Sequence, residues 1–221
     1  MPHATKTCWV TALPSSLGWM AILGKGRLVE QLVFGYPTRA KAIAALDKGI
    51  SHHAGPIGNR VFGGADIPVC PAFNGRQECL PHHGEKCDLV RRLQAYAEGE
   101  PEDFSDIQVD LDGMSRFRRR VFEACRKIPY GKTLSYAELA VTAGFPKAFR
   151  AVGNCMAANR VPLIIPCHRV VCSNGQIGRF SAPGGEQMKR RLLQIEAPDW
   201  LSRVSRHGGA DIPVCHKKSS S

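Results

Sequence analysis

A chain of 221 residues with 43% hydrophobic content has the size and composition of a globular protein with one large or two small domains. No apolar run reaches the roughly 18–20 residues of a membrane span, and the first residues lack the basic-then-apolar layout of a signal peptide. We therefore expect an intracellular protein without a membrane partner. Its nine cysteines are odd in number and scattered, which favours free thiols over a disulfide framework.

The positive charge is concentrated in one part of the chain. The formal net charge is +11, of which residues 1–112 carry −2, residues 113–200 carry +10 and residues 201–221 carry +3. A basic segment favours a polyanionic partner, because lysines and arginines near phosphates release counterions. A solvated basic surface is equally compatible with the charge alone.

The first part of the chain predicts short strands followed by a helix. β-rich runs occupy residues 9–11, 19–23 and 28–34, and residues 38–46 place Ala and Leu at helical spacing. We expect an N-terminal α/β domain over residues 1–105.

Residues 50–86 interrupt this pattern and predict a disordered insert, since they are rich in Gly, Pro, His and Cys and lack periodicity. The octapeptide at 63–70 recurs at 208–215, in a basic, serine-ended tail over 201–221 that we also expect to be disordered. Two copies do not make a repeat fold. The insert offers close-spaced cysteines and histidines, but only half of a zinc knuckle, so we predict no metal site. These residues are Cys70, Cys79, His82, His83 and Cys87.

A second domain is expected over residues 113–200. A helix at 88–98 and an acidic linker at 98–112 precede it, and a helix with arginines on its outer faces then runs from Ser115 to Ile128. Ser135 and Glu138 form a capping box that opens the next helix. A helix over 147–158 follows a tight turn, which together predicts a helix-turn-helix. Its small-residue face either enters a nucleic-acid groove or packs against a neighbouring helix.

The remaining segments read as a buried strand at 161–165, a tight hairpin around residues 173–175 and a last helix at 187–196. Cys167 follows the apolar run and has His168 as its neighbour. A thiol attacks as its thiolate, and an imidazole or local positive charge lowers its pKa. Neighbouring strand residues point to opposite faces, so contact between the two requires a turn or a bridging water. A buried structural cysteine beside an incidental histidine is the alternative.

The string Pro-Cys-His-Arg-Val at 166–170 resembles the active-site signature of the O6-alkylguanine-DNA alkyltransferases. Other segments follow the same family order, including residues 146–153, Asn159, which lies 8 residues before Cys167, and the Lys189–Glu196 helix. The resemblance implies an α/β (α+β) fold with a small ribonuclease-H-like N-terminal domain and a winged-helix-like helix-turn-helix domain that holds the reactive thiol.

In this resemblance Cys167 accepts an alkyl group from O6 of guanine, with O4 of thymine a further substrate. His168 activates the thiol through a water, and Glu196 orients the imidazole. Tyr136 assists protonation of the leaving guanine, and Asn159 braces the turn before the active-site strand. The thioether product has no good leaving group, so the protein acts once.

The resemblance also implies double-stranded DNA carrying alkylated bases as partner, bound by a monomer without cofactor. Arg150 fills the space that the extruded base vacates, while the helix around it enters the minor groove. Arg116, Arg118, Arg119 and Arg120 are expected at the DNA backbone. The expected DNA- and base-binding residues are Ser135, Arg150, Gly153, Met156, Arg169, Phe180 and Ser181.

The chain departs from the family pattern at three places. Phe180 stands where the family often has a tyrosine, which removes a hydroxyl donor from the base pocket. Ala182 and Pro183 are additional residues that reshape the pocket rim. Some relatives bind zinc through N-terminal cysteines, but only Cys8 is comparably placed here, so that site is not carried over.

Three other functions remain open at this point. A non-enzymatic damage sensor of the same fold would flip the base without accepting the alkyl group, and Cys167 argues against it. A helix-turn-helix transcription regulator would leave the thiol incidental or redox-sensing. A cysteine hydrolase would need an acyl substrate and would turn over.

Overall fold

The computed structural model describes residues 8–47, 84–174 and 176–199. Most of the predicted insert, the tail over 201–221 and both copies of the octapeptide lie outside these ranges. The chain divides into two compact units. The first contains residues up to Gly113 together with Arg160–Ile164, and the second contains Met114–Asn159 and the residues from Ile165 onward.

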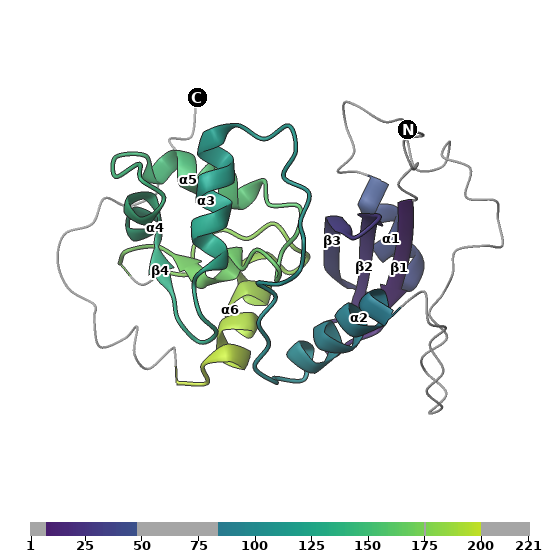
Figure 1. Cartoon of the computed structure of the whole chain (residues 1–221). Helices are drawn as coiled ribbons and strands as arrows, with labels where there is room; N and C mark the ends of the chain where they lie inside the picture. The colour runs from purple at the N-terminus through teal and green to yellow at the C-terminus, as the bar shows by residue number, and fades with distance from the viewer. Residues whose placement is uncertain (1–7, 48–83, 175, 200–221) are drawn as a thin grey trace, which may run out of the picture. The chain divides into compact units, whose positions relative to one another are not determined.

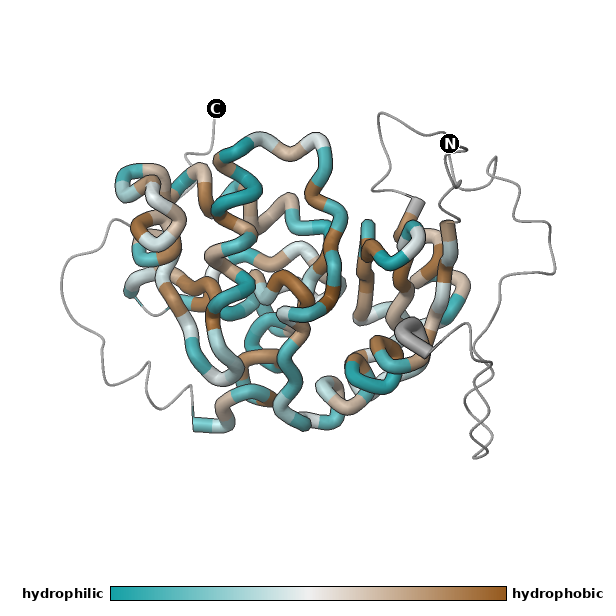
Figure 2. The backbone as a smooth tube through the Cα atoms, in the orientation of Figure 1, coloured by the Kyte–Doolittle hydropathy of each residue, from teal (hydrophilic) through white to brown (hydrophobic). Residues whose placement is uncertain are grey.

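The first unit is built on an antiparallel sheet of β1 (Cys8–Leu13), β2 (Trp19–Lys25) and β3 (Leu28–Tyr36), in that order. Helices α1 (Arg39–Asp47) and α2 (Gly84–Ala97) belong to the same unit (Figure 1). Val10, Ala21 and Leu23 of the sheet pack with Ala42 and Leu46 of α1 to form its core. Figure 2 shows brown, hydrophobic stretches along these strands, which is the residue type that a buried core requires. The predicted strands are therefore present and somewhat longer than expected, and the first helix has its expected length, shifted by one residue.

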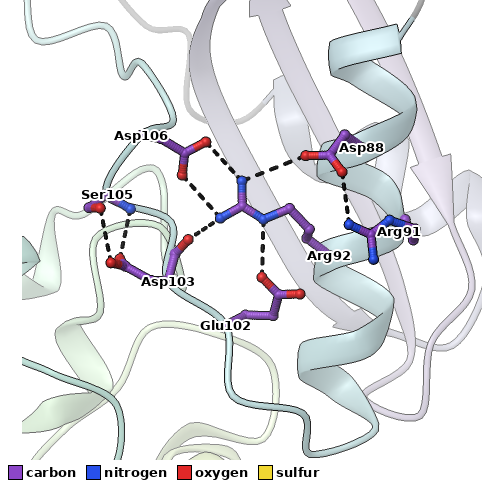
Figure 3. Close-up of polar contacts among 7 residues, drawn as sticks. All are labelled: Asp88, Arg91, Arg92, Glu102, Asp103, Ser105 and Asp106. Carbon is purple, nitrogen blue, oxygen red and sulfur yellow. Dashed lines mark hydrogen bonds and ion pairs between the residues drawn. The ribbon is translucent and has the colours of Figure 1, made fainter.

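The acidic segment predicted as a linker is fastened to α2 by one arginine (Figure 3). Arg92 donates from Nε to Glu102 over 3.0 Å and from Nη1 to Asp106 over 2.9 Å, and its guanidinium lies 5.3 Å from the centroid of the Phe104 ring. The hydrogen bond to Asp106 is the largest cause of a raised pKa for Arg92. Further along the segment, Val109 forms a parallel bridge with Val29 of β3.

The second unit packs three helices together, α3 (Arg116–Arg126), α4 (Tyr136–Thr142) and α5 (Phe149–Ala157) (Figure 1). Ser115 caps α3, and the predicted capping box at the start of α4 is present, with both hydrogen bonds between Ser135 and Glu138 formed. The alternating teal and brown of α3 in Figure 2 reflects exposed arginines and a buried apolar face.

Two short strands and a final helix complete this unit. β4 (Leu134–Ser135) pairs in parallel with β5 (Val170–Val171), which directly follows the 3₁₀ turn η2 (Cys167–Arg169). Helix α6 (Gly185–Glu196) packs against η2. The turn η2 is thus held by the strand pair that follows it and by its packing against α6.

Residues 161–165 do not form the predicted strand. They are largely buried, as the apolar run implied, but they adopt a turn in which Leu163 has a φ of 73°. Pro162 lacks the N–H that a strand ladder requires, and a left-handed residue ends an extended run. The predicted hairpin is also reduced: the Cys172 N–H donates to the Gln176 carbonyl over 2.8 Å, without a second strand in the described residues.

No helix within the described ranges is both long and apolar enough to cross a membrane.

Candidate active site

Cys167 and His168 lie on a tight turn rather than on a strand. The Cys167 N–H donates to the Ile165 carbonyl over 2.7 Å, and the Arg169 N–H donates to the Pro166 carbonyl over 2.9 Å. A 3₁₀ turn removes the alternation that would send neighbouring strand side chains to opposite faces. The turn that sequence reasoning required for a working Cys-His pair is therefore present.

Asn159 holds the thiol from the end of α5. Its Nδ2 donates to the Cys167 sulfur over 3.1 Å and to the Ile165 carbonyl over 2.8 Å. Both Asn159 and Cys167 are buried. One amide thus fixes the sulfur and the backbone that leads into its turn.

His168 contacts the carboxylate expected to orient it. His168 Nε2 lies 2.7 Å from Glu196 Oε1, and the imidazole is fully buried. Arg169 occupies the same carboxylate, with Nε 2.9 Å from Oε2 and Nη2 2.9 Å from Oε1. The Gly131 N–H donates to Glu196 Oε2 over 3.1 Å. Glu196 is therefore shared between an imidazole, a guanidinium and a backbone amide.

Arg169 is consequently part of the interior, not of the expected DNA-binding set. Its Nη1 donates to the Ile128 carbonyl over 2.6 Å, and its guanidinium lies 5.8 Å from the centroid of the Tyr130 ring. A buried arginine is stable when every donor has a partner, and Glu196 supplies the opposite charge. The prediction that Arg169 contacts DNA does not agree with this position.

The charge states of the site follow from burial and from these contacts. Burial raises the pKa of Cys167, against the opposing effects of the Asn159 hydrogen bond and the nearby Lys189 charge. Burial also lowers the pKa of His168. For Glu196, burial acts to raise the pKa, but the hydrogen bonds from His168 and Arg169 outweigh it and lower the pKa to about 2. The resting site therefore holds a thiol, a neutral imidazole and an ionised carboxylate.

Lys189 is a buried cation in this site, and sequence reasoning assigned it no role. It lies on α6 with no exposed surface, donates to the Val170 carbonyl over 2.5 Å and sits 5.7 Å from the centroid of the Tyr136 ring. Burial lowers the pKa of Lys189 to about 8, while nearby thiols including Cys167 act to raise it. Its spacing of four and seven residues to Leu193 and Glu196 places it on the buried helix face, which was the available signal.

Tyr136 is the first residue of α4, and its hydroxyl lies beside Gly178 in the segment that follows β5. A Cβ on Gly178, whose φ is 75°, would lie 3.2 Å from the Tyr136 hydroxyl oxygen and 3.3 Å from the Cys172 sulfur. Only glycine fits this left-handed position beside both side chains. Tyr136 is thereby confined between Gly178 and Lys189.

The other predicted binding residues lie in several environments. Arg150 is exposed on α5, and Gly153 has open space beside its Cα. Met156 is buried, and the Ser135 hydroxyl accepts the cap hydrogen bond from Glu138. In the loop before α6, Phe180 is half-buried and Ser181 is exposed. Arg150 therefore supplies an exposed positive charge on α5.

Within the described ranges no three His, Cys, Asp or Glu side chains gather closely enough to hold a metal ion. Four of the five insert residues considered for zinc lie outside the described ranges, and Cys87 lies on α2.

Comparison with known proteins places this site in a family. Residues 116–198 match the family model described as 6-O-methylguanine DNA methyltransferase, DNA binding domain. The chain is 42% identical over 126 residues to the methylated-DNA–protein-cysteine methyltransferase of Mycobacterium leprae, covering 57% of this chain and 74% of that protein. It is 40% identical over 121 residues to the protein of the same name from Mycobacterium tuberculosis, covering 55% and 71%.

Solved structures agree with the sequence matches. A crystal structure of Mycobacterium tuberculosis OGT in complex with DNA matches with a TM-score of 0.60 and 28% identity, over 86% of this chain and 92% of that one. The O6-methylguanine-DNA methyltransferase of Pyrococcus kodakaraensis shares the fold, with a TM-score of 0.56 at 24% identity, over 85% and 99%. The matched residues span the Cys167 turn, Asn159 and Glu196, and this chain belongs to the methylated-DNA–protein-cysteine methyltransferase family.

Proposed function

We propose that this protein repairs DNA by moving a methyl or larger alkyl group from O6 of guanine to the sulfur of Cys167. O4-alkylthymine is a second substrate, from which the same displacement moves the alkyl group to Cys167. The observation that carries the proposal is the buried pair of contacts at η2, Asn159 to Cys167 and His168 to Glu196. A structural cysteine would need neither a donor on its sulfur nor an oriented imidazole beside it.

The chemistry is displacement at a saturated carbon. The bond from carbon to Sγ forms as the bond from carbon to O6 breaks, and the electron pair of the broken bond stays on the guanine. The thiol proton passes through a water to His168, and the imidazolium that forms is stabilised by Glu196. The guanine anion is neutralised by a proton from the Tyr136 hydroxyl. The thioether cannot be displaced again, so each chain acts once.

The resting charge states suit this sequence of steps. A neutral imidazole can accept a proton, whereas an imidazolium cannot, and burial keeps His168 neutral. Hydrogen bonds from His168 and Arg169 hold Glu196 in its ionised form. Thiolate formation is therefore coupled to proton transfer at the moment of reaction.

DNA would be engaged by the helix-turn-helix of α4 and α5. We assign residues 113–200 as a winged-helix-like DNA-binding and alkyl-acceptor domain, and residues 1–105 as a ribonuclease-H-like domain. Arg150 would fill the gap left by the extruded base, whose unstacking costs a few kcal/mol. Exposed arginines at the start of α3 would contact phosphates, which adds sequence-independent affinity. We propose that the protein acts as an intracellular monomer on double-stranded DNA containing alkylated bases.

The test follows the fate of a labelled methyl group. The protein is incubated with a duplex carrying one radiolabelled O6-methylguanine, and label is quantified on protein and on DNA at increasing ratios of substrate to protein. The proposal expects label on protein that saturates at one methyl per chain. Tight binding with all label left on DNA would support a damage sensor. Release of small labelled products with turnover would support a hydrolase, and equal binding to unmodified duplex without transfer a regulator.

A further inference from the structure

Arg150, the exposed cation of α5, contacts an aromatic ring next to it in the sequence. The guanidinium carbon lies 5.6 Å from the centroid of the Phe149 ring. Within the described ranges Arg150 forms no ion pair with a carboxylate. The Phe149 ring is therefore the contact that restrains this side chain before DNA is bound.

Phe149 is itself held in place. Its ring is half-buried, and its backbone begins α5 directly after the turn of the helix-turn-helix. That turn is fastened by an edge-on contact between Phe117 and Phe145, whose centroids are 4.8 Å apart, and by the Ala148 N–H donating to the Phe145 carbonyl over 2.9 Å. The half-buried ring is thus carried by a backbone position that the turn holds in place.

Restraint of a long side chain matters for a residue that must enter a stacked duplex. A free arginine samples many rotamers, and ordering it upon intrusion opposes base extrusion. A cation held over a ring has already lost much of that freedom. The attraction also strengthens where water is excluded, as between the walls of a groove.

We propose that Phe149 is a positioning residue for DNA repair, which holds the Arg150 guanidinium ready to occupy the space of the extruded base. This inference rests on the proposed function and on the intruding role of Arg150. Phe149 acts through Arg150, so its contribution should disappear when the cation is absent.

A double-mutant cycle tests this dependence. The four proteins are the full-length chain, Phe149→Leu, Arg150→Met and the double variant, with Phe149→Tyr as the conservative control that keeps the ring. Extrusion is followed by stopped-flow fluorescence of 2-aminopurine placed beside O6-methylguanine in a duplex. Methyl transfer is measured in parallel on the duplex and on a single strand of the same sequence, where no stacked base has to be extruded.

Phe149→Leu should slow extrusion about fivefold, the rate equivalent of one exposed cation–π contact. Phe149→Tyr should restore it, and Phe149→Leu should add no slowing to Arg150→Met. The loss on the single strand should be clearly smaller than on the duplex. Unchanged extrusion in Phe149→Leu, failure of tyrosine to restore it, or equal slowing in both backgrounds would overturn the inference.

Failure of the proposed function gives a different result. In that case the full-length chain transfers no methyl group to itself from either substrate. If the full-length chain transfers methyl normally and the cycle shows no coupling, the inference about Phe149 alone is wrong. Thermal unfolding of each variant shows whether the variant is folded. A misfolded variant would transfer methyl more slowly to the same degree on the single strand and on the duplex, and this result would count against a positioning role.

Discussion

Asn159 donates one hydrogen bond to the Cys167 sulfur over 3.1 Å and another to the Ile165 carbonyl over 2.8 Å, from the same nitrogen. A residue just beyond the C-terminal cap of α5 is thereby joined to the nucleophile and to its turn. A thiolate gains more from such a donor than a thiol does, so this contact favours the reactive form.

Asn159→Ala should therefore slow methyl transfer and destabilise the protein together. Without the donor the pKa of Cys167 rises above its already raised value, and the rate at neutral pH should fall at least tenfold. The buried Ile165 carbonyl loses one of its two donors and keeps the Cys167 N–H, so the loss of stability from this bond should be about 1 kcal/mol. The pH dependence of transfer, with chemical denaturation beside it, measures both effects. An unchanged rate in a destabilised protein would assign Asn159 a structural role alone.

Glu196 should make the protein sensitive to acid. Its folded pKa of about 2 lies below the value of 4.5 for an unperturbed carboxyl. A depressed carboxyl contributes stability that is present above the unfolded pKa and lost as pH falls toward the folded one. The expected loss is roughly 3 kcal/mol between about pH 5 and pH 2. Urea unfolding across this range measures it.

The matched variants for that titration are Arg169→Lys and Arg169→Met. Lysine retains a charge near Glu196 and should keep part of the acid sensitivity. Methionine leaves a buried carboxylate without its guanidinium partner and should cost about 3–5 kcal/mol at neutral pH. Equal stability of wild type and Arg169→Met at pH 7 would contradict the shared role of Glu196.

Lys189→Met should slow methyl transfer at neutral pH and change the stability of the protein mainly at higher pH. Removing a buried charge close to Cys167 raises the pKa of the thiol and should slow transfer at pH 7.5, although the variant keeps the shape of the side chain. The folded pKa of Lys189, about 8, lies below the ordinary lysine value of 10.5, so the unfolded chain binds more protons between these values. Wild-type stability should then gain roughly 3 kcal/mol relative to the variant as pH rises from 8 to 10.5.

Paired unfolding curves of wild type and Lys189→Met at pH 7.5, 9 and 10.5 check whether the stability of the wild type rises relative to the variant with pH. A difference that stays constant with pH would show that Lys189 is not titrating from a buried position.

Arg92→Met should loosen the first unit without touching the chemistry. Arg92 joins α2 to Glu102 and Asp106 and is largely buried, so its loss should cost about 1–2 kcal/mol. Arg91→Met is the matched control, because its pair with Asp88 is exposed and should be worth at most about 0.5 kcal/mol. Thermal unfolding compares the two, and equal shifts would contradict the role of the network.

Local patterns allowed much of this fold to be predicted. The capping box at Ser135 and the apolar spacing of α3 depend on residues within one helix turn of each other, and both are present. The apolar run before Cys167 indicated burial correctly. It could not indicate conformation, because burial is compatible with a strand or a turn, and Pro162 with the left-handed Leu163 decides for the turn.

Contacts between residues far apart in the sequence limited how much of the site could be predicted. The pairing of His168 with Glu196 was expected only through family resemblance, since 28 residues separate them. Arg169 was expected among the DNA-binding residues only through the family resemblance, yet it pairs with Glu196 in the interior. Lys189 was overlooked although its spacing on α6 marked a buried face.

Peptide mass spectrometry after reaction with an O6-methylguanine duplex tests directly whether Cys167 is the methyl acceptor. We expect a gain of one methyl per chain, located on Cys167, with Cys125, Cys155 and Cys172 unmodified. Cys167→Ala should abolish the gain while duplex binding is retained. Methylation of another cysteine, or full repair by Cys167→Ala, would show that Cys167 is not the required methyl acceptor.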